Sequence, residues 1–570
     1  MAEALPRNTE VAAQFELLAD LLEIEGYDAF RVLAYRRAAA LIRDTGGSIA
    51  QLALDGKAKQ LQGIGAVIEG KIAEIVEDGE VHALTKHKEI VPVDVVAFTR
   101  LPGLGPKTAR RIWKDLGVTT LPELRAAAEG QRLRTLSGLG AKIEETVLKA
   151  LDETKPAVAD ADRALLGTAL PAVLEAVEAL RAHPAAVKVS EAGSARRRRE
   201  TVRDLDIIAT ATDPDALIAH FVELPWVIDV VARGGTKATV LSSQGLRFDL
   251  RVVPPECYGN LLQHFTGSKH HNMALREEAV RHGLSVSEYG VKVVETGEVI
   301  THAEEADLYE LLGYEYIPPE LRENLGELEA ARSGSLPELV ELRDLRGDLH
   351  AHTTWSADGK ASAEEMAAAA KARGYRYLAV TDHSHYLREG RMQAQDAELD
   401  ELNARLAPFR LLKGVEANIK ADGTIDVPED VLATREWVIA SLHTSFDRSP
   451  TERVLGAMEH PHVHCIGHLT GRKIGRRAGA AIDVERVVEK ALETGTCLEI
   501  DSQPDRLDMP DTIARLAGEA GVRIAVTSDA HRLSALAYVE LGIGQARRAW
   551  LTKQQILNTR TWPQVEKVRK

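Results

Sequence analysis

The sequence predicts a protein of several domains: an all-helical N-terminal region, an α+β middle domain and a C-terminal barrel related to the TIM barrel. At 570 residues the chain is too long to fold around a single hydrophobic core. Helices separated by short glycine loops fill the first 155 residues, and apolar runs of strand length follow from residue 160 onward. Beyond residue 337, strand-like runs alternate with helices, as they do in barrels of repeated βα units.

The composition predicts a globular protein of the cytoplasm. Its 45% hydrophobic and 28% charged residues are ordinary, and no apolar run approaches the roughly 18 residues that span a membrane. Cys257, Cys465 and Cys497 lie far apart, which argues for a reducing compartment. The net charge of -15 does not exclude a polyanionic partner, because binding depends on the local field and the run Arg196–Arg199 is strongly basic.

Three glycine loops recur in the N-terminal region, each after a Leu-x pair and before a helix. Glycine lets the backbone approach a phosphate closely, and the free N–H groups of a helix start point toward it. Such contacts ignore base sequence, so three copies favour a DNA backbone as ligand over simple turns between helices. The loops are Gly63-Ile64-Gly65, Gly103-Leu104-Gly105 and Gly138-Leu139-Gly140, with Lys107 and Lys142 two residues beyond the second glycine of the last two.

The middle domain begins with a predicted helix from Asp162 to His183, and its strands form a mainly antiparallel sheet. The strand-like runs are Ala186–Val189, Leu205–Ala209, Trp226–Val231, Ala238–Leu241 and Leu246–Val253. Alternation along a strand puts Asp204 and Asp206 on one face, and it puts Asp249 on the face opposite Phe248 and Leu250. If the two strands are neighbours, the three carboxylates converge and require cations such as Mg²⁺ or Mn²⁺. Two such ions suit phosphoryl transfer, although acidic strand ends also occur on surfaces.

Two further motifs flank these carboxylates. Gly193-Ser194 resembles an anion site at a helix start, with Arg197 one turn after Ser194. Phe265-Thr266-Gly267-Ser268 precedes a helix on which Asn272 and Arg276 share a face. That face is suited to contact a nucleotide base and a template strand.

The C-terminal region carries histidines and carboxylates at or just after the ends of its predicted strands. That end of the strands is the catalytic face of barrel enzymes. The strands are Leu378–Thr381, Val438–Leu442, Cys465–Leu469, Leu498–Ile500 and Ile524–Thr527, with helices such as Ala363–Ala372 and Thr512–Ala520 between them. The candidate ligands are His350, His352, Asp358, His383, Glu416, His443, His468, Asp529 and His531.

Nine ligand-type residues at equivalent strand ends predict a centre of two or three metal ions that hydrolyses a phosphate ester. Six histidines suit Zn²⁺, Mn²⁺ or Fe²⁺ better than Mg²⁺. Asp348 and Asp382 are candidates for orienting ligating histidines. Arg472 and Arg506 hold a substrate phosphate or are surface arginines; the sequence leaves both readings open.

Residues 1 to 325 resemble the family X DNA polymerases, whose best-known member is eukaryotic DNA polymerase beta. The resemblance is carried, in family order, by GSARRRRETVRDLD, RFDLRVVP, HFTGSKHHNMALR and YIPPELREN. It implies a nucleotidyltransferase palm with a thumb and an N-terminal domain that grips the 5′-phosphate of a gap. The implied roles are metal binding by Asp204, Asp206 and Asp249, activation of the primer 3′-hydroxyl by Asp249, triphosphate binding by Ser194 and Arg197, and nucleotide binding by Gly267, Asn272 and Arg276.

Three positions bear on how far this resemblance reaches. Lys71 matches the lysine that forms a Schiff base with an abasic sugar in some relatives, while an exposed lysine otherwise serves as a solvated or phosphate-binding charge. Arg203 stands where the family often has Gly, and His264 stands where many relatives have Tyr. These departures bear on the activity of the polymerase site and on discrimination against ribonucleotides.

Residues 346 to 570 resemble the PHP (polymerase and histidinol phosphatase) domain in the set HxH, Asp, TDH, Glu, His, His and DxH. The resemblance implies a distorted TIM-like (β/α)7 barrel with phosphoesterase activity. In bacterial family X polymerases such domains are associated with Mn²⁺-dependent 3′→5′ exonuclease action and with related 3′-end or abasic-site (AP endonuclease) processing.

Together these observations predict a bacterial repair polymerase with its own end-cleaning nuclease, acting on gapped or nicked DNA and dNTPs as a monomer without membrane attachment. Three alternatives stay open: a DNA-bound nuclease or 3′-phosphatase with a decayed polymerase site, a hydrolase of small phosphate monoesters, and a non-enzymatic DNA-binding scaffold. The expected domains are a helical DNA- and 5′-phosphate-gripping domain (1–85), a fingers-like helix–hairpin–helix domain (86–157), the palm (158–255), a thumb that binds the nascent base pair (256–328), a linker (329–345) and the PHP phosphoesterase (346–570).

Overall fold

The structure is a computed structural model that describes residues 5–6, 8–44, 48–60, 64–101, 104–136, 138–153 and 163–569. The chain divides into two compact units. The first comprises Met1–Arg163, Glu178–Val189 and Arg203–Val252, and the second comprises Ala164–Val177, Ser190–Val202 and Val253–Lys570. Among the residues described, no helix has the length and apolar character needed to cross a bilayer.

The N-terminal part of the first unit is all-helical, as predicted. Its helices are α1 (Asn8–Glu25), α2 (Ala29–Asp44), α3 (Ile49–Leu54), α4 (Ala66–Asp78), α5 (His82–Ile90), α6 (Pro106–Leu116), α7 (Leu121–Glu129) and α8 (Ala141–Glu153), with 3₁₀ segments at Ala58–Gln60, Val93–Arg100 and Leu133–Thr135. One apolar cluster runs through them from Val11 to Leu151. The expected boundary between 85 and 86 falls inside α5, so the two helical segments share a core.

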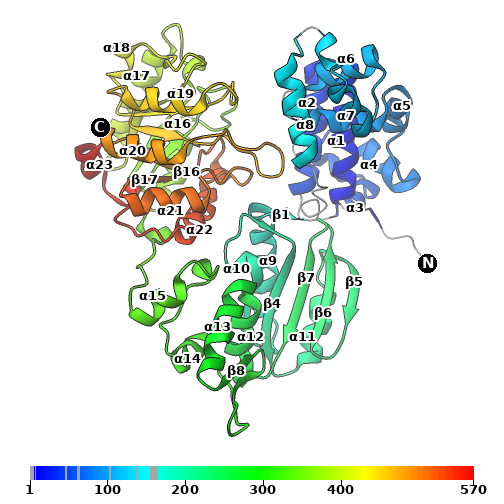
Figure 1. The fold of residues 1–570 in the computed structure, drawn as a ribbon, viewed down its shortest axis with the longest axis vertical. Helices are drawn as coiled ribbons and strands as arrows, with labels where there is room; N and C mark the ends of the chain where they lie inside the picture. Colours follow the sequence, from blue (N-terminus) through cyan, green and yellow to red (C-terminus); the bar gives the residue numbers. More distant parts are fainter. Residues whose placement is uncertain are drawn as a thin grey trace. The chain divides into compact units, whose positions relative to one another are not determined.

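The sheet of the first unit has the order β2-β4-β7-β6-β5, and its strands lie side by side in Figure 1. The strands are β2 (Ala186–Glu191), β4 (Asp204–Ala211), β5 (Val227–Arg233), β6 (Lys237–Ser242) and β7 (Arg247–Val252), with helix α11 (Pro214–Val222) between β4 and β5. β6 runs antiparallel to β5 and to β7, whereas β4 and β7 are parallel. The β5–β6 and β6–β7 pairings are thus antiparallel, as predicted. The candidate catalytic residues Asp204, Asp206 and Asp249 lie on the parallel pair β4 and β7.

The helix expected over Asp162–His183 is shorter in the structure, where α9 spans Leu166–Arg181. Residues Ala164–Leu165 pair instead as β1 with β3 (Thr201–Val202). The helix ends before Pro184, because a proline disfavours helical backbone in the residue before it. Asp162 lies outside the described residues.

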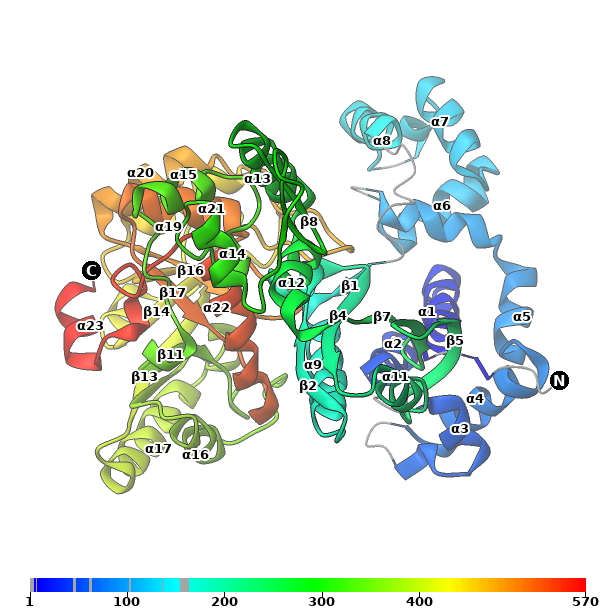
Figure 2. The same cartoon turned by 90° about the horizontal axis from the view of Figure 1, so that it is seen from below.

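The second unit contains a small α+β region, and its helices α12, α13 and α14 lie near β8 in Figures 1 and 2. Its elements are α10 (Gly193–Arg196), α12 (Tyr258–Thr266), α13 (Lys269–Arg281), β8 (Leu284–Ser287), β9 (Gly290–Val293), β10 (Val299–Ile300), α14 (Glu305–Leu311), α15 (Glu327–Ser333) and 3₁₀ segments at Pro255–Cys257, Pro319–Leu321 and Leu342–Asp344. The three strands form an antiparallel sheet of order β10-β9-β8.

The rest of the second unit is a parallel barrel, as predicted, with its helices outside the strands (Figure 1). The strands, adjacent in chain order, are β11 (Gly347–Ala351), β12 (Tyr377–Val380), β13 (Arg410–Asn418), β14 (Trp437–Ser441), β15 (Cys465–Gly467), β16 (Cys497–Asp501) and β17 (Ile524–Thr527). A parallel bridge between Ala351 and Ala530 brings the last strand back to the first. The helices are α16 (Ala363–Ala372), α17 (Arg391–Leu406), α18 (Glu429–Leu432), α19 (Pro450–Glu459), α20 (Val484–Thr494), α21 (Asp511–Ala520), α22 (Val539–Arg548) and α23 (Trp562–Val568), with 3₁₀ segments at Ser384–Tyr386, Leu533–Tyr538 and Leu557–Thr559.

Alternation along these strands divides the barrel core into two clusters. One cluster takes an apolar residue from every strand, which only the inside of a barrel can bring together: Leu349, Tyr377, Ala379, Leu412, Trp437, Ile439, Cys465, Cys497 and Ala525, closed from one end by Leu557 and Trp562. The other cluster takes the alternate residues, such as Leu378 and Val438, together with the helices. The interior therefore has an apolar floor at the N-terminal ends of the strands.

Candidate active sites

The metal-ligand candidates of the barrel continue the inward-facing pattern above this apolar floor. Glu416 lies four residues beyond Leu412, His443 lies four beyond Ile439, and Asp529 lies four beyond Ala525. An even spacing keeps the side chain on the same face of an extended chain. In these three strands an apolar residue therefore comes first, and a ligand-type residue follows at or just beyond the C-terminal end.

Glu416 is the central carboxylate, at 1% exposure. Its Oε2 is 2.7 Å from His383 Nδ1 and 3.5 Å from His350 Nε2, while its Oε1 is 3.2 Å from His443 Nε2 and 3.0 Å from His468 Nε2. Burial alone would raise the pKa of Glu416, but the surrounding histidines hold it well below its usual range. The carboxylate is therefore ionised and faces imidazoles contributed by several different strands.

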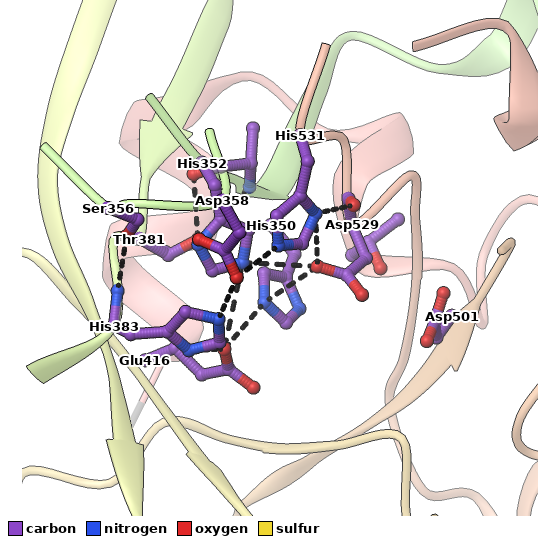
Figure 3. Close-up of polar contacts among 12 residues, drawn as sticks. His350, His352, Ser356, Asp358, Thr381, His383, Glu416, Asp501, Asp529 and His531 are labelled. Atoms are coloured by element: carbon purple, nitrogen blue, oxygen red, sulfur yellow. Dashed lines mark hydrogen bonds and ion pairs between the residues drawn. The ribbon is translucent and has the colours of Figure 1, made fainter. Parts of the chain in front are cut away.

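Two further carboxylates complete the cluster (Figure 3). Asp529 Oδ1 is 3.1 Å from His352 Nε2, 3.5 Å from His350 Nε2 and 3.6 Å from His531 Nδ1. Asp358 Oδ2 points between two rings, 3.3 Å from His383 Nε2 and 3.5 Å from His531 Nε2. The structure thus brings all nine sequence-predicted residues into one centre.

The chemistry of this centre fits metal ions. Within the described residues, three overlapping groups have ligand atoms within 4.8 Å of one another: His352–His383–His531, His350–His352–Asp529 and His383–Glu416–His443. Both ring nitrogens of His352 are buried and make no hydrogen bond, a costly state for polar atoms that an ion bound to the nitrogen with the free lone pair would relieve. Burial and His531 lower the pKa of His352 to about 3, which keeps it in the neutral form that binds metals.

The ligands differ in their access to solvent. The His350 and His352 side chains are fully buried, whereas that of Asp358 is 47% exposed and those of His443 and His531 are 26% and 28% exposed. The centre therefore has a closed floor and an open rim, and a substrate reaches it from the rim formed by Asp358, His443 and His531.

Glu499 is a positioning residue that the sequence analysis did not single out. It accepts hydrogen bonds from His350 Nδ1 at 2.7 Å, Thr527 Oγ1 at 2.6 Å and the backbone N–H of His468 at 2.6 Å. A carboxylate behind a ligating imidazole fixes its tautomer and orientation. The inward-facing pattern of Cys497, two residues earlier, is the signal that identifies Glu499.

Asp348 and Asp382, the candidates for orienting ligating histidines, contact the backbone near the ligands rather than the imidazole rings. Asp382 accepts from the N–H and hydroxyl of Thr353, the N–H of Ser356 and Gln395 Nε2. Asp348 accepts from the backbone N–H groups of His350 and Ser528. Both carboxylates therefore fix the backbone that carries ligands, because their oxygens meet N–H groups of the strand ends rather than imidazoles.

The structure also gives different surroundings to Arg472 and Arg506, for which the sequence left two interpretations open. Arg472 binds Glu200 at 2.7 Å and the carbonyl groups of Arg506 and Leu507, so it has a structural role. The side chain of Arg506 is 16% exposed and its Nε is 3.4 Å from Asp501 Oδ2. Burial would lower the pKa of Arg506, yet the charges of Asp501, Asp529 and Glu416 raise it, so this cation lies within electrostatic reach of two of the metal-ligand carboxylates.

The three aspartates predicted for the middle domain also come together, within the first unit. Asp206 lies opposite Asp249 in the parallel pairing of β4 and β7, and Asp204 lies opposite Arg247. Arg247 Nε is 3.2 Å from Asp249 Oδ2 and 3.9 Å from Asp204 Oδ1, and the Thr239 hydroxyl donates to Asp249. Carboxylate oxygens on two adjacent strands suit Mg²⁺ or Mn²⁺.

Arg203 does not disturb this pair of strands. It is exposed, and β4 begins directly after it with the pairing of Asp204 and Arg247. The residue that could have displaced the strand start therefore leaves the register of the carboxylates intact.

The residues predicted to bind a nucleotide lie in the second unit. Arg197 donates to the carbonyl oxygen of Thr266, and a Cβ on Gly267 would lie 3.0 Å from Arg197 Nη1, a tight contact that would displace the guanidinium slightly. Gly267 also has a φ of +69°, which side chains rarely allow. Ser194 lies in α10, one turn before Arg197.

Asn272 and Arg276 share a face of α13, as predicted. Asn272 Nδ2 donates to the His264 carbonyl at 2.8 Å, and Arg276 Nη2 is 2.7 Å from His264 Nδ1. His264, which replaces the tyrosine of many relatives, thus packs directly against both residues of that face. Its ring also lies beside Phe265, with the centroids 5.2 Å apart.

The glycine loops of the N-terminal helices have the geometry of a phosphate-contacting hairpin. Gly65 and Gly105 are the N-caps of α4 and α6, and Gly140 directly precedes α8. These three glycines are exposed with open space around them, while the apolar residues between the paired glycines (Ile64, Leu104 and Leu139) are buried. Gly138 has a φ of +84°, and Gly63 and Gly103 lie outside the described residues.

Lys107 and Lys71 lie on helices that begin at these loops. Lys107 is exposed in the first turn of α6, where its charge adds to that of the helix start. Lys71 lies in the middle of α4 and is partly buried. A role for Lys71 as a lyase nucleophile stays a prediction.

The folds and sites define a polymerase beta-like protein joined to a barrel phosphoesterase. Matching family descriptions are "Helix-hairpin-helix domain" at residues 6–81, "SAM-like Helix-hairpin-helix tandem" at 95–153, "DNA polymerase beta thumb" at 261–323 and "PHP domain" at 348–496. The chain is 39% identical over 568 residues to the DNA polymerase/3'-5' exonuclease PolX of Bacillus subtilis (strain 168), covering 98% of each protein. The chain therefore belongs to the PolX family of bacterial family X DNA polymerases that carry a PHP domain.

Two further relatives match part of the chain. A probable phosphatase of Caldanaerobacter subterraneus is 36% identical over 197 residues, which are 32% of this chain and 75% of that protein. DNA polymerase lambda of Rattus norvegicus is 26% identical over 348 residues, which are 55% of this chain and 56% of that protein.

Proposed function

We propose that this protein is a DNA repair polymerase that fills gaps under template direction and processes 3′-ends with its PHP domain. The observation that carries the proposal is that one chain holds two separate sets of metal-ligand side chains, each brought together by its own fold. The carboxylates of β4 and β7 serve nucleotidyl transfer, and the histidine-rich barrel centre serves phosphoester hydrolysis. Gapped or nicked DNA and dNTPs are the substrates, and the protein acts as a monomer.

For the polymerase reaction, Asp204, Asp206 and Asp249 would hold two Mg²⁺ or Mn²⁺ ions, which when bound would supply positive charge to stabilise the oxygens of an in-line displacement. Asp249 assists deprotonation of the primer 3′-hydroxyl, and Thr239 and Arg247 fix the orientation of its carboxylate.

On the nucleotide side, Ser194 and Arg197 bind the triphosphate, and Gly267 and Asn272 contact the incoming nucleotide. Arg276 contacts the template strand. The hairpin glycines and Lys107 bind the DNA backbone without reading its sequence, which suits an enzyme that must act on gaps of any sequence. The helical domain of residues 1–85 grips the 5′-phosphate of the gap.

In the hydrolytic reaction, the nine barrel ligands hold two or three ions, with Mn²⁺, Zn²⁺ and Fe²⁺ as candidates. Bound there, the ions supply Lewis acidity to the phosphate ester. Arg506 lies within electrostatic reach of the centre and compensates charge on the phosphate, and Glu499 holds the His350 ring in place. The open rim admits a strand end, so we propose 3′→5′ exonuclease action and related 3′-end processing, with abasic-site cleavage as a further activity.

A 3′-phosphatase is the second candidate for the barrel. A probable phosphatase of Caldanaerobacter subterraneus is similar to this chain over 197 residues, and hydrolysis of a monoester would use the same ligands. A 3′-phosphorylated primer distinguishes the two reactions, because a phosphatase yields a 3′-hydroxyl product of unchanged length and an exonuclease yields shorter strands.

The test compares wild type with Asp204→Ala plus Asp206→Ala and with His350→Ala plus His352→Ala. Each protein receives a gapped duplex with a 5′-labelled primer, dNTPs and Mn²⁺ or Mg²⁺. We expect the first double mutant to lose extension and keep 3′ cleavage, and the second to do the reverse. Extension that survives loss of both aspartates contradicts the polymerase assignment, and cleavage that survives loss of both histidines contradicts the nuclease assignment.

A further inference from the structure

We propose that Arg548 of the PHP barrel is a positioning residue for Arg197 and thereby for the triphosphate of the incoming nucleotide. The inference rests on the proposed polymerase function, because it assumes that Arg197 binds the triphosphate. Arg548, Arg197 and their partners all belong to the second compact unit. The barrel would then contribute to nucleotide addition as well as to hydrolysis.

Arg548 ends helix α22 and is 5% exposed. Its Nη1 donates to the carbonyl oxygen of Arg197 at 2.9 Å and to Glu323 Oε1 at 2.9 Å. The same Glu323 oxygen accepts from Arg197 Nε at 3.1 Å. On its other side, Arg548 Nε donates to Asp511 Oδ2 at 2.8 Å. One guanidinium from the barrel therefore holds both the backbone of Arg197 and the carboxylate that binds its side chain.

The barrel also packs closely against the segment that carries Arg197. A Cβ on Gly544 of α22 would lie only 3.0 Å from the Cβ of Arg198, so a larger residue there would push the two segments a few tenths of an ångström apart. Arg472, in the loop after the metal-ligand candidate His468, binds Glu200 at 2.7 Å. Residues 197 to 200 are thus contacted from two separate parts of the barrel, which restricts the positions open to the Arg197 backbone.

The charges explain why this contact matters for a polyanionic ligand. Glu323 lies between Arg197 and Arg548, and a lone carboxylate there would repel a triphosphate and compete for Arg197. Burial would raise the pKa of Glu323, but the two guanidinium charges lower it, so the carboxylate stays ionised. Arg548 balances this charge and leaves Arg197 available to the triphosphate.

The neighbouring residue Arg547 provides a matched control. It lies on the same helix and binds Glu320 at 2.7 Å and the Val340 carbonyl at 3.1 Å. Both arginines therefore join the barrel to the segment around residues 319–323. Of the two, and among the described residues, only Arg548 donates hydrogen bonds to Arg197 and Glu323.

The experiment measures steady-state addition of a single dNTP to a gapped duplex by the full chain. We expect Arg548→Gln to raise the KM for dNTP about tenfold, equivalent to about 1.4 kcal/mol, with kcat changed less than about threefold. Arg547→Gln should change the KM less than about twofold. Adding Glu323→Gln to Arg548→Gln should restore most of the KM, because it removes the uncompensated charge. The 3′ cleavage activity reports that each variant is folded.

Each outcome decides the inference. Equal effects of Arg548→Gln and Arg547→Gln, or a double variant no better than Arg548→Gln alone, would overturn it. If Arg548→Gln fails to fold, Asp511→Asn carries the same test, since it weakens the hold on Arg548 and should raise the KM about threefold; an unchanged KM overturns the inference. Absence of nucleotide addition by wild type would instead refute the proposed polymerase function, so the two failures are distinguishable.

Discussion

Glu305 binds two arginines at once, and its replacement by Gln should destabilise the region around α14. Glu305 accepts from Arg322 Nη1 at 2.6 Å and from Arg196 Nη1 and Nη2 at 3.0 and 2.7 Å. Burial alone would raise its pKa, but Arg322 and Arg196 lower it from 4.5 to about 2. A shift of that size corresponds to about 3 kcal/mol of stability, in line with the cost of breaking a buried ion pair.

The pH dependence follows from the direction of this shift. Because the pKa of Glu305 is lower in the folded protein, its contribution is fully present above pH 4.5 and is lost as the pH falls toward about 2. The destabilisation caused by Glu305→Gln should therefore be largest at neutral pH. At pH 3 the difference between variant and wild type should be smaller by about 2 kcal/mol.

Hydrogen exchange measured by mass spectrometry checks this prediction, because it resolves one region of a multidomain chain. At pH 7 the peptides that cover α12 and α14 should lose about two orders of magnitude in protection in Glu305→Gln, and Glu310→Gln, an exposed position of α14, should behave as wild type. Equal protection in wild type and Glu305→Gln at pH 7, or a difference that is the same at pH 3 and pH 7, would refute the ion-pair reasoning.

Three further predictions concern the proposed activities. Glu499→Gln should lower 3′ cleavage about 10- to 100-fold without lowering extension, because His350 loses its orienting carboxylate. The control is Glu493→Gln, an exposed position on α20, and equal cleavage by the two variants would contradict the role of Glu499. Removal of metal by a chelator should lower the melting temperature of wild type, because an ion at 100 times its Kd adds about 2.7 kcal/mol to the free energy of unfolding. An equally large decrease in His350→Ala plus His352→Ala would argue against ions at these histidines. Lys107→Ala should reduce the slope of log K for DNA against log salt by about 1, whereas Lys86→Ala, exposed on α5 away from the hairpin loops, should leave the slope unchanged.

Much of the architecture could be predicted from the sequence because its signals are local. Short, mainly apolar strands with ligand-type residues at or near their C-terminal ends predict both the barrel and the end at which its chemistry lies. The period of two likewise places Asp206 and Asp249 on matching faces before the pairing of β4 and β7 is known. The glycine spacing in the N-terminal region is also a local signal, and it predicts the exposed starts of α4, α6 and α8.

The run Arg196–Arg199 shows what local signals do not determine. The sequence predicts a basic patch, but the structure gives each of the first three arginines a carboxylate partner: Glu305 for Arg196, Glu323 for Arg197 and Glu191 for Arg198. Two of these partners lie more than 100 residues away in the chain, with |i−j| of 109 for Glu305 and 126 for Glu323. No periodicity within the run distinguishes a structural arginine from one that binds a ligand.

The difference between Arg196 and Arg197 follows from how their partners are held. Glu305 is fixed between Arg196 and the fully buried Arg322, so Arg196 belongs to a closed ion-pair network that a ligand would have to break. Glu323 keeps a second partner, Arg548, if Arg197 turns toward a triphosphate. Arg197 can therefore release Glu323 for a triphosphate without leaving that carboxylate unpaired. Arg548, which lowers the free-energy cost of this exchange, belongs to the hydrolytic domain. A repair polymerase built in this way would depend on its PHP barrel for nucleotide binding even when no hydrolysis takes place.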